Sequence, residues 1–169
     1  VRLGLVGEDG ETHHGLYDLA YMRARPGMAI AVPRDGSQLR AMLALSLRHE
    51  GPLALRYPRG TVPSAEVRGP AGDADQVELG RGELLRDGSA AGVLAVGPVV
   101  HACLAAAAEL AGQGLEVAVA DAKFVKPLDL ALLRRLVANG RPLLVVEEGV
   151  AAGGLGGAVL EALMAAGWP

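Results

Sequence analysis

The sequence has one cysteine, Cys103, among 169 residues, and only 3% of its residues are aromatic. One thiol cannot form an intramolecular disulfide or a thiolate metal cluster, so a disulfide scaffold is excluded. No apolar run approaches the roughly 18 residues of a membrane-spanning helix, so no membrane segment is predicted. The net charge of -3 provides no basic stripe for neutralising phosphates, which argues against a nucleic-acid partner. We therefore expect a cytoplasmic protein.

The residues that are plentiful indicate a folded chain with many short loops. Hydrophobic residues make up 51% of the sequence, which excludes intrinsic disorder. The 24 glycines and 10 prolines do not gather in any low-complexity stretch. The chain starts with valine inside an apolar run and stops soon after a helical pattern, so we expect both ends to be truncated.

Apolar runs alternate with helical periodicities along the chain, which predicts an α/β fold. Residues 60–76 interrupt this alternation with prolines, glycines and scattered charges, so we place a linker at 64–76 between units 1–63 and 77–169. The βαβ pattern on each side of the linker predicts two parallel-sheet units. The predicted strands are 3–6, 28–32, 53–57, 92–96, 115–120 and 142–146, and the predicted helices are 15–23, one behind the N-cap Asp35, 98–110, 128–137 and 155–166.

The loop after the first predicted strand is the first candidate site. Ligands of open parallel sheets bind beyond the carboxyl ends of the strands. Residues 7–15 follow such an end and include three carboxylates and two histidines, among them Asp9 and His13. A carboxylate and an imidazole on one loop can orient each other and move protons near neutral pH. The alternative is a solvated acidic turn with exposed histidines.

Two further groups of basic residues lie at or just after the ends of predicted strands. Residues 56–60 read Arg-Tyr-Pro-Arg-Gly, and an arginine there can form two hydrogen bonds to a phosphate or a carboxylate. The alternative is an exposed partner in a surface ion pair. Lys123 and Lys126 are expected in a loop, where solvation is favoured over catalysis.

The glycine-rich segment 153–157, Gly-Gly-Leu-Gly-Gly, lies between a predicted strand and a predicted helix. Helix N-termini bind anions, so a phosphate loop is one interpretation. The lysine of a Walker motif is absent, however, and Glu147 and Glu148 just before the segment would repel a phosphate. We favour close packing of the helix on the strand.

Residues 4–15 resemble a family signature. They read Gly-Leu-Val-Gly-Glu-Asp-Gly-Glu-Thr-His-His-Gly, and the 1-deoxy-D-xylulose-5-phosphate synthase family has Gly-x-Val-Gly-x-Asp-Gly-x-Thr-His-Gln-Gly. The Asp-Gly-x-Thr-His part is shared among transketolase-like enzymes. Further matches in the same order are Asp-Leu-x-Tyr at 18–21, Pro-Gly-Met at 26–28, Pro-x-Asp at 33–35, Gly-Pro-x-Ala-Leu-Arg-Tyr-Pro-Arg-Gly at 51–60, Phe-Val-Lys-Pro-Leu-Asp at 124–129, and Glu-Glu at 147–148 followed by Gly-Gly-x-Gly at 153–156.

The resemblance implies a transferase that joins pyruvate to glyceraldehyde 3-phosphate and releases CO2, using thiamine diphosphate and Mg²⁺. In the family this reaction supplies isoprenoid, thiamine and pyridoxal synthesis, and the full enzyme is a homodimer with three α/β domains. Residues 1–63 would then be the later part of the pyrimidine-binding domain, and residues 77–169 a truncated transketolase C-terminal-like domain. The remainder of the enzyme is therefore an implied partner.

The resemblance also implies roles for four residues. Asp9 and His13 match the active-site aspartate and histidine of the signature: Asp9 would hold the hydroxyl of the acceptor substrate, and His13 would donate or accept a proton. Arg59 matches the arginine that anchors the acceptor phosphate, and Arg2 aligns with a second phosphate-contacting arginine. The family's Gly-Asp-Gly magnesium motif and its cofactor-activating glutamate precede residue 1. No cofactor or metal ligand is therefore expected in this segment, and the segment alone is expected to be inactive.

Two other functions are compatible with these residues. The chain could belong to the β subunit of a thiamine-dependent 2-oxoacid dehydrogenase, which transfers an acyl group to a lipoyl carrier. It could also be a non-catalytic α/β module for dimerisation or regulation, a description that fits residues 77–169 because they carry no cluster of acids, bases or nucleophiles at strand ends.

Overall fold

The computed structural model describes residues 1–61 and 77–168, so the whole of the predicted linker at 64–76 lies outside the described residues. The strands form a three-stranded sheet in the order β2-β1-β6 and a four-stranded sheet in the order β3-β5-β4-β7. The strands are β1 (Ala29–Ala31), β2 (Leu53–Leu55), β3 (Glu83–Arg86), β4 (Ala91–Ala95), β5 (Val117–Asp121), β6 (Phe124–Lys126) and β7 (Leu143–Val146). The α-helices are α1 (Asp18–Arg23), α2 (Gly36–Ser46), α3 (Val99–Ala111), α4 (Leu130–Leu136) and α5 (Leu155–Ala166), and short 3-10 helices span Gly7–Asp9, Glu11–His13 and Ala138–Gly140.

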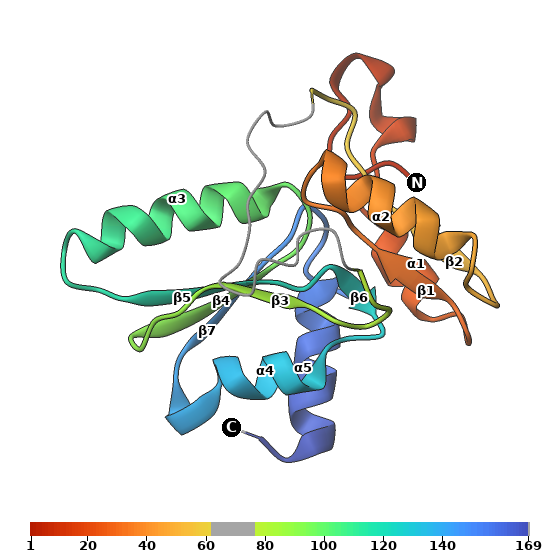
Figure 1. Cartoon of the computed structure of the whole chain (residues 1–169). Helices are drawn as coiled ribbons and strands as arrows, with labels where there is room; N and C mark the ends of the chain where they lie inside the picture. The colour runs from red at the N-terminus through yellow and green to blue at the C-terminus, as the bar shows by residue number, and fades with distance from the viewer. Residues whose placement is uncertain (62–76, 169) are drawn as a thin grey trace.

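The predicted α/β class with parallel pairing is confirmed. Strand β1 pairs in parallel with β2, and β4 pairs in parallel with both β5 and β7. Helix α3 covers one face of the larger sheet, whereas α4 and α5 lie on the other (Figure 1). Each sheet also has an antiparallel edge strand that the sequence patterns did not predict, β6 in the first and β3 in the second. The domain boundaries placed at 64 and 76 stay predictions.

The first predicted strand, residues 3–6, does not form. The chain there makes only isolated bridges, from Arg2 to Tyr57 and from Gly4 to Gly15. The amide of Leu3 donates to the carbonyl of Tyr57 over 3.0 Å, and the amide of Tyr57 donates to the carbonyl of Val1 over 3.1 Å. The chain start therefore lies along the segment that follows β2, which places Arg2 near Arg59.

Strand β6 joins the two sheets, because it follows β5 along the chain yet pairs with β1. Lys126 lies opposite Ile30 in this pairing, and its Nζ donates to the carbonyl oxygens of Arg23 and Arg25 over 2.8 and 2.7 Å. Lys123 is only 4% exposed. The expectation of two solvated loop lysines is therefore wrong, since both are held by tertiary contacts.

One apolar cluster spans both sheets. It combines Ile30 and Val32 of the first sheet region with Leu94 and Ala118 of the second. Removing apolar surface from water contributes roughly 25 cal/mol per Å², so this shared core holds the two sheets in a fixed arrangement. Among the residues that the structure describes, no helix is both long and apolar enough to cross a membrane.

A buried group of charged and polar side chains also joins the two sheets, and we call it the Arg34 cluster. Its centre is Arg34, which is fully buried and whose Nη1 lies 2.8 Å from both Asp121 Oδ2 and Glu83 Oε2. Asp35 caps α2, as predicted, by accepting from the amide of Gln38. The members are Arg34, Asp35, Gln38, Glu83, Asp121 and Lys123.

Candidate functional site

The loop that carries Asp9 and His13 forms two consecutive 3-10 turns, joined at Gly10. It projects from the top of the molecule beside the chain start (Figure 1). Its base is closed by two hydrogen bonds: the amide of Gly15 donates to Gly4, and the amide of Val6 donates to Nδ1 of His14 over 3.2 Å. His14, which stands where the family signature has glutamine, thus accepts a backbone hydrogen bond.

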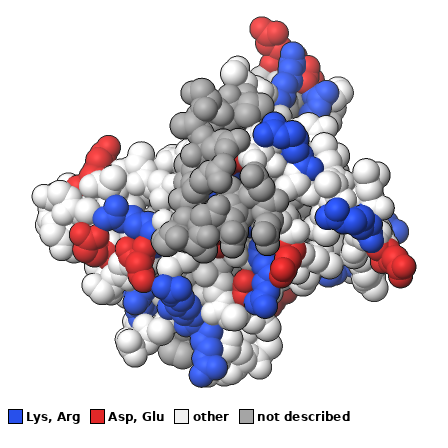
Figure 2. Space-filling model, in the orientation of Figure 1, with Lys and Arg blue, Asp and Glu red and all other residues white. Residues whose placement is uncertain are grey.

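Asp9 lies between two arginines that come from different parts of the chain. Nη1 of Arg59 lies 2.5 Å from Asp9 Oδ1, and Nη1 of Arg2 contacts Oδ2 of the same carboxylate. The Asp9 side chain is 26% exposed, whereas those of Arg2 and Arg59 are 47% and 56% exposed. Figure 2 shows acidic and basic side chains next to one another at this end of the molecule. Three of the four predicted site residues therefore meet in the structure.

The two arginines keep the Asp9 carboxylate charged. Partial burial raises the pKa of Asp9, but the hydrogen bond and charge of Arg59 and the charge of Arg2 outweigh this effect and hold the pKa below its usual value. Two guanidinium groups that converge on one carboxylate also have the donors that a phosphate needs, because both anions accept charge-assisted hydrogen bonds from arginine.

Arg59 lies between two open hollows. One, with a volume of about 300 Å³, is lined by residues 1–2 and 57–59. The other, with a volume of about 420 Å³, is lined by residues 5–8 and 59–60. Both fall in the range of sites for small molecules. A ligand in either hollow could contact Arg59 with its anionic end.

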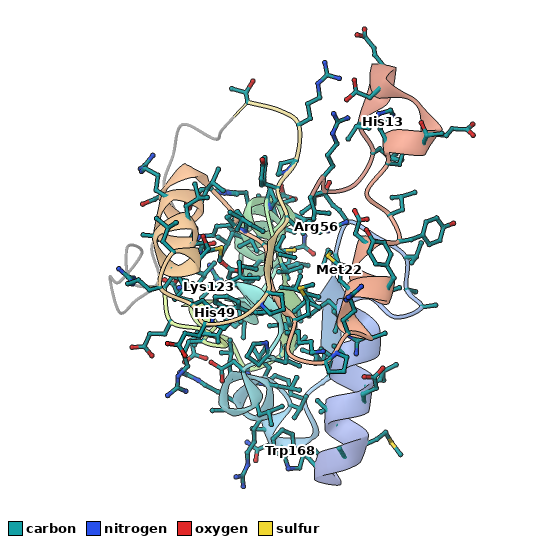
Figure 3. All side chains as sticks on the ribbon, turned by 90° about the vertical axis from the view of Figure 1, so that its right-hand side faces the viewer. His13, Met22, His49, Arg56, Lys123 and Trp168 are labelled. Atoms are coloured by element: carbon teal, nitrogen blue, oxygen red, sulfur yellow. The ribbon has the colours of Figure 1, made fainter. Side chains whose placement is uncertain are left out.

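His13 is exposed, and it takes no part in the ion pairs that join Asp9 to Arg2 and Arg59. Its Nδ1 is 3.1 Å from the hydroxyl oxygen of Thr12. Figure 3 shows the imidazole high on the loop, well away from the buried Arg56 below it. The described hydrogen bonds do not join His13 to the ion-paired group, so its imidazole is available to a ligand.

The predicted Arg-Tyr-Pro-Arg-Gly segment splits into two different environments. Arg59 is exposed and pairs with Asp9, but Arg56 is fully buried. The sequence carries no signal for this difference, because Arg56 shares the face of Ala54, whereas a strand pattern would favour burial of the face with Leu53 and Leu55. Sequence reasoning did not separate the two arginines.

The glycine-rich segment holds a carboxylate of this chain instead of an external anion. Glu147 accepts from the amides of Leu155 and Gly156 over 2.8 and 2.9 Å, so it occupies the N-terminus of α5. The diphosphate of a cofactor does not fit here, since its donors are taken. No group of acids, histidines or cysteines in the described part of the chain could hold a metal ion.

We expect Gly154→Ala to destabilise the fold by about 1–3 kcal/mol, the usual penalty for overpacking. A Cβ at residue 154 would lie 2.4 and 2.5 Å from the Glu147 carboxylate oxygens and 2.6 Å from the carbonyl oxygen of Val150. Urea denaturation measures the change. Gly60→Ala is the control, because a Cβ there meets no atom of the described residues within 4 Å. Equal stability of the two variants would show that the segment is loosely packed.

Family comparisons agree with this architecture. Residues 1–64 match the family described as transketolase, pyrimidine binding domain, and residues 80–168 match transketolase, C-terminal domain. The chain therefore belongs to the transketolase family. A solved structure described as a split gene transketolase, inactive beta4 tetramer, is 35% identical with a TM-score of 0.83, and the alignment covers 91% of this chain and 49% of that one.

Among its curated relatives, the chain is similar to 1-deoxy-D-xylulose-5-phosphate synthases. The enzyme of Magnetococcus marinus is 51% identical over 162 residues, and that of Carboxydothermus hydrogenoformans is 46% identical over 160 residues. These alignments cover 96% and 95% of this chain but only 25% of each relative. The chain thus spans about a quarter of the length of these relatives, and the resemblance stated from the sequence is confirmed.

A transketolase from Pichia stipitis shows the same fold at 23% identity, with a TM-score of 0.69. The alignment covers 89% of this chain and 23% of the yeast enzyme. This likeness supports the fold and carries no argument about substrates.

Proposed function

We propose that this chain forms the acceptor-binding part of the active site in a thiamine diphosphate-dependent 1-deoxy-D-xylulose-5-phosphate synthase. That enzyme condenses pyruvate with glyceraldehyde 3-phosphate and releases CO2, and its product enters isoprenoid, thiamine and pyridoxal synthesis. The observation that carries the proposal is the convergence of Arg2 and Arg59 on one anion, the carboxylate of Asp9. The phosphate of an acceptor substrate is also an anion that accepts hydrogen bonds from guanidinium groups, as the Asp9 carboxylate does.

Each residue then has one task. Arg59 and Arg2 bind the acceptor phosphate, which competes with Asp9 for their guanidinium groups. The carboxylate of Asp9 accepts a hydrogen bond from an acceptor hydroxyl. The imidazole of His13 donates a proton to the acceptor carbonyl oxygen, which becomes a hydroxyl of the product.

The rest of the enzyme supplies what this chain does not. Thiamine diphosphate provides the electron sink for decarboxylation of pyruvate when it is bound. We assign the cofactor and its Mg²⁺ mainly to regions outside this chain, because the glycine-rich segment is occupied by Glu147. We further propose a homodimeric, cytoplasmic enzyme, as the relatives' family suggests.

Arg59→Ala in the complete synthase tests the proposal. We expect the KM for glyceraldehyde 3-phosphate to rise roughly 10- to 100-fold, because a charge-assisted hydrogen bond contributes about 1.5–3 kcal/mol. The KM for pyruvate should stay within about twofold. Steady-state assays with each substrate varied in turn measure both constants.

The control is Arg135→Ala, because Arg135 forms an exposed ion pair with Asp87 over 2.9 Å, far from the loop in sequence. It should leave both KM values unchanged. An unchanged acceptor KM in Arg59→Ala would refute the phosphate assignment. Use of a lipoyl domain as the acceptor would instead identify a 2-oxoacid dehydrogenase subunit, and a complete chain without turnover would identify a non-catalytic module.

A further inference from the structure

Arg56 is a charged residue with no access to solvent. Its side chain is fully buried, and its Nη2 donates to the carbonyl oxygens of Gly15 and Glu148, the latter over 2.7 Å. Nε and Nη1 are also buried and have no hydrogen-bond partner among the described residues. Burial lowers the pKa of Arg56, although the carboxylates of Asp18, Glu147 and Glu148 favour its charged form. Two unpartnered nitrogens make this arginine unfavourable for stability by itself.

The two carbonyl groups that Arg56 binds belong to segments far apart in the sequence. Gly15 ends the loop that carries Asp9 and His13, whereas Glu148 follows β7 of the larger sheet. A second bond ties the same segments, since the amide of Val150 donates to the carbonyl of Leu16 over 3.3 Å. Arg56 therefore lies where the base of the loop meets the segment that follows β7, and Figure 3 shows it below His13.

The position of Gly15 is coupled to that of Arg2. A Cβ at residue 15 would lie 1.9 Å from the carbonyl oxygen of Arg2, so the two backbones touch. The amide of Gly15 is also bound to Gly4 over 2.9 Å. A displacement of the Gly15 carbonyl must therefore move both the loop and the strand-like segment that carries Arg2.

We infer that Arg56 is a positioning residue for the acceptor site: it holds the base of the 7–15 loop against the segment after β7, so that Arg2 and Asp9 keep their arrangement with Arg59. The inference rests on the proposed function of that site. Arg56 itself touches no substrate. One guanidinium nitrogen satisfies two backbone carbonyls from two segments, and no neutral side chain of similar length donates to both.

The test uses the complete synthase with Arg56→Met and Arg56→Lys. We expect Arg56→Met to raise the KM for glyceraldehyde 3-phosphate about tenfold while the KM for pyruvate changes by less than twofold. Arg56→Lys should recover part of this loss, to about a threefold increase, because an ammonium group still donates to one of the carbonyls. Hydrogen exchange provides a readout besides activity: the amides of Gly15 and Val150 should exchange at least tenfold faster in Arg56→Met, with β4 and β5 unchanged.

Arg34→Met is the matched control, since Arg34 is, among the described residues, the other fully buried arginine and also joins the two sheets. Arg34→Met should lower the free energy of unfolding. At temperatures where this variant is folded, the ratio of the KM for glyceraldehyde 3-phosphate to the KM for pyruvate should equal that of the parent enzyme. A purely structural Arg56 would behave like Arg34, with no selective rise in the acceptor KM, and that result would overturn the inference.

The outcomes separate this inference from the proposed function. If Arg59→Ala raises the acceptor KM but both Arg56 variants leave it and the exchange rates unchanged, Arg56 does not position the site and the acceptor function stands. If Arg59→Ala has no effect either, the acceptor function itself is wrong. If Arg56→Met fails to fold, Arg56→Lys decides: an acceptor KM equal to that of the parent enzyme overturns the inference.

Discussion

Replacing His13 by alanine in the complete synthase is expected to lower kcat about 100- to 10,000-fold, which is the usual contribution of a general acid or base. The KM for glyceraldehyde 3-phosphate should change much less, because the proposed phosphate ligands are Arg2 and Arg59, which contact the Asp9 carboxylate, and not His13. The imidazole is exposed at the end of the loop and its described hydrogen bond is with Thr12. Its loss should therefore leave the fold intact.

Added imidazole distinguishes proton transfer from a general disturbance of the loop. It should restore part of the turnover of His13→Ala, since a small base can diffuse into the space that the ring leaves. His49→Ala is the control, because His49 lies well away from His13 (Figure 3) and should keep full turnover. A kcat of His13→Ala within about threefold of the parent enzyme would show that another group carries the proton.

Elements with a strong local pattern were predictable from the sequence. Helix α5 spans Leu155–Ala166, as predicted, because apolar residues at helical spacing define its buried face. The edge strands β3 and β6 were not predictable, since each is short and owes its strand geometry to a partner far along the chain. The same reason explains why residues 3–6 are not a strand: the partner segment offers only single bridges.

The candidate site was predictable as a set of residue types but not as a geometry. Asp9 and His13 lie in one contiguous segment, residues 4–15, so the resemblance of this segment to a family signature is detectable from the sequence alone. The meeting of Arg2 and Arg59 at Asp9 depends on tertiary structure, as does the burial of Arg56 two residues beyond Ala54. Lys123 was wrongly expected to be exposed to solvent. Its ion-pair partner, Glu83, belongs to the edge strand β3, which the hydrophobic pattern of the sequence did not predict.

Arg34→Met should be the most destabilising single change in the Arg34 cluster. Arg34 is fully buried, and its Nη1 lies 2.8 Å from both Asp121 and Glu83. Removing one partner of a buried ion pair leaves an uncompensated charge, which costs about 3–5 kcal/mol. We expect a loss of that size in the free energy of unfolding, measured by urea denaturation. Arg135→Met, which breaks the exposed pair with Asp87, should cost less than about 1 kcal/mol.

A second substitution shows whether the loss comes from the unpaired charge. Asp121→Asn in the Arg34→Met background removes that charge. It keeps a side-chain oxygen for the backbone amide of Lys123, which in the parent protein donates to Asp121 Oδ1 over 2.9 Å. The double variant should recover about 1–3 kcal/mol relative to the sum of the single changes, as expected for residues in direct contact. Simple additivity of the two losses would mean that Arg34 contributes by packing alone.

The stability deficit of Arg34→Met should also depend on pH. Burial raises the pKa of Asp121, although Arg34 and Gln38 favour its charged form. A carboxyl group whose pKa is raised by folding stabilises the fold below its ordinary pKa and loses that contribution as pH rises through the raised value. Without Arg34 the pKa of Asp121 rises further, so this loss extends to higher pH. The deficit relative to the parent protein should therefore be larger near pH 8 than near pH 5, and a deficit independent of pH would show that removing Arg34 does not change the pKa of Asp121 in the folded protein.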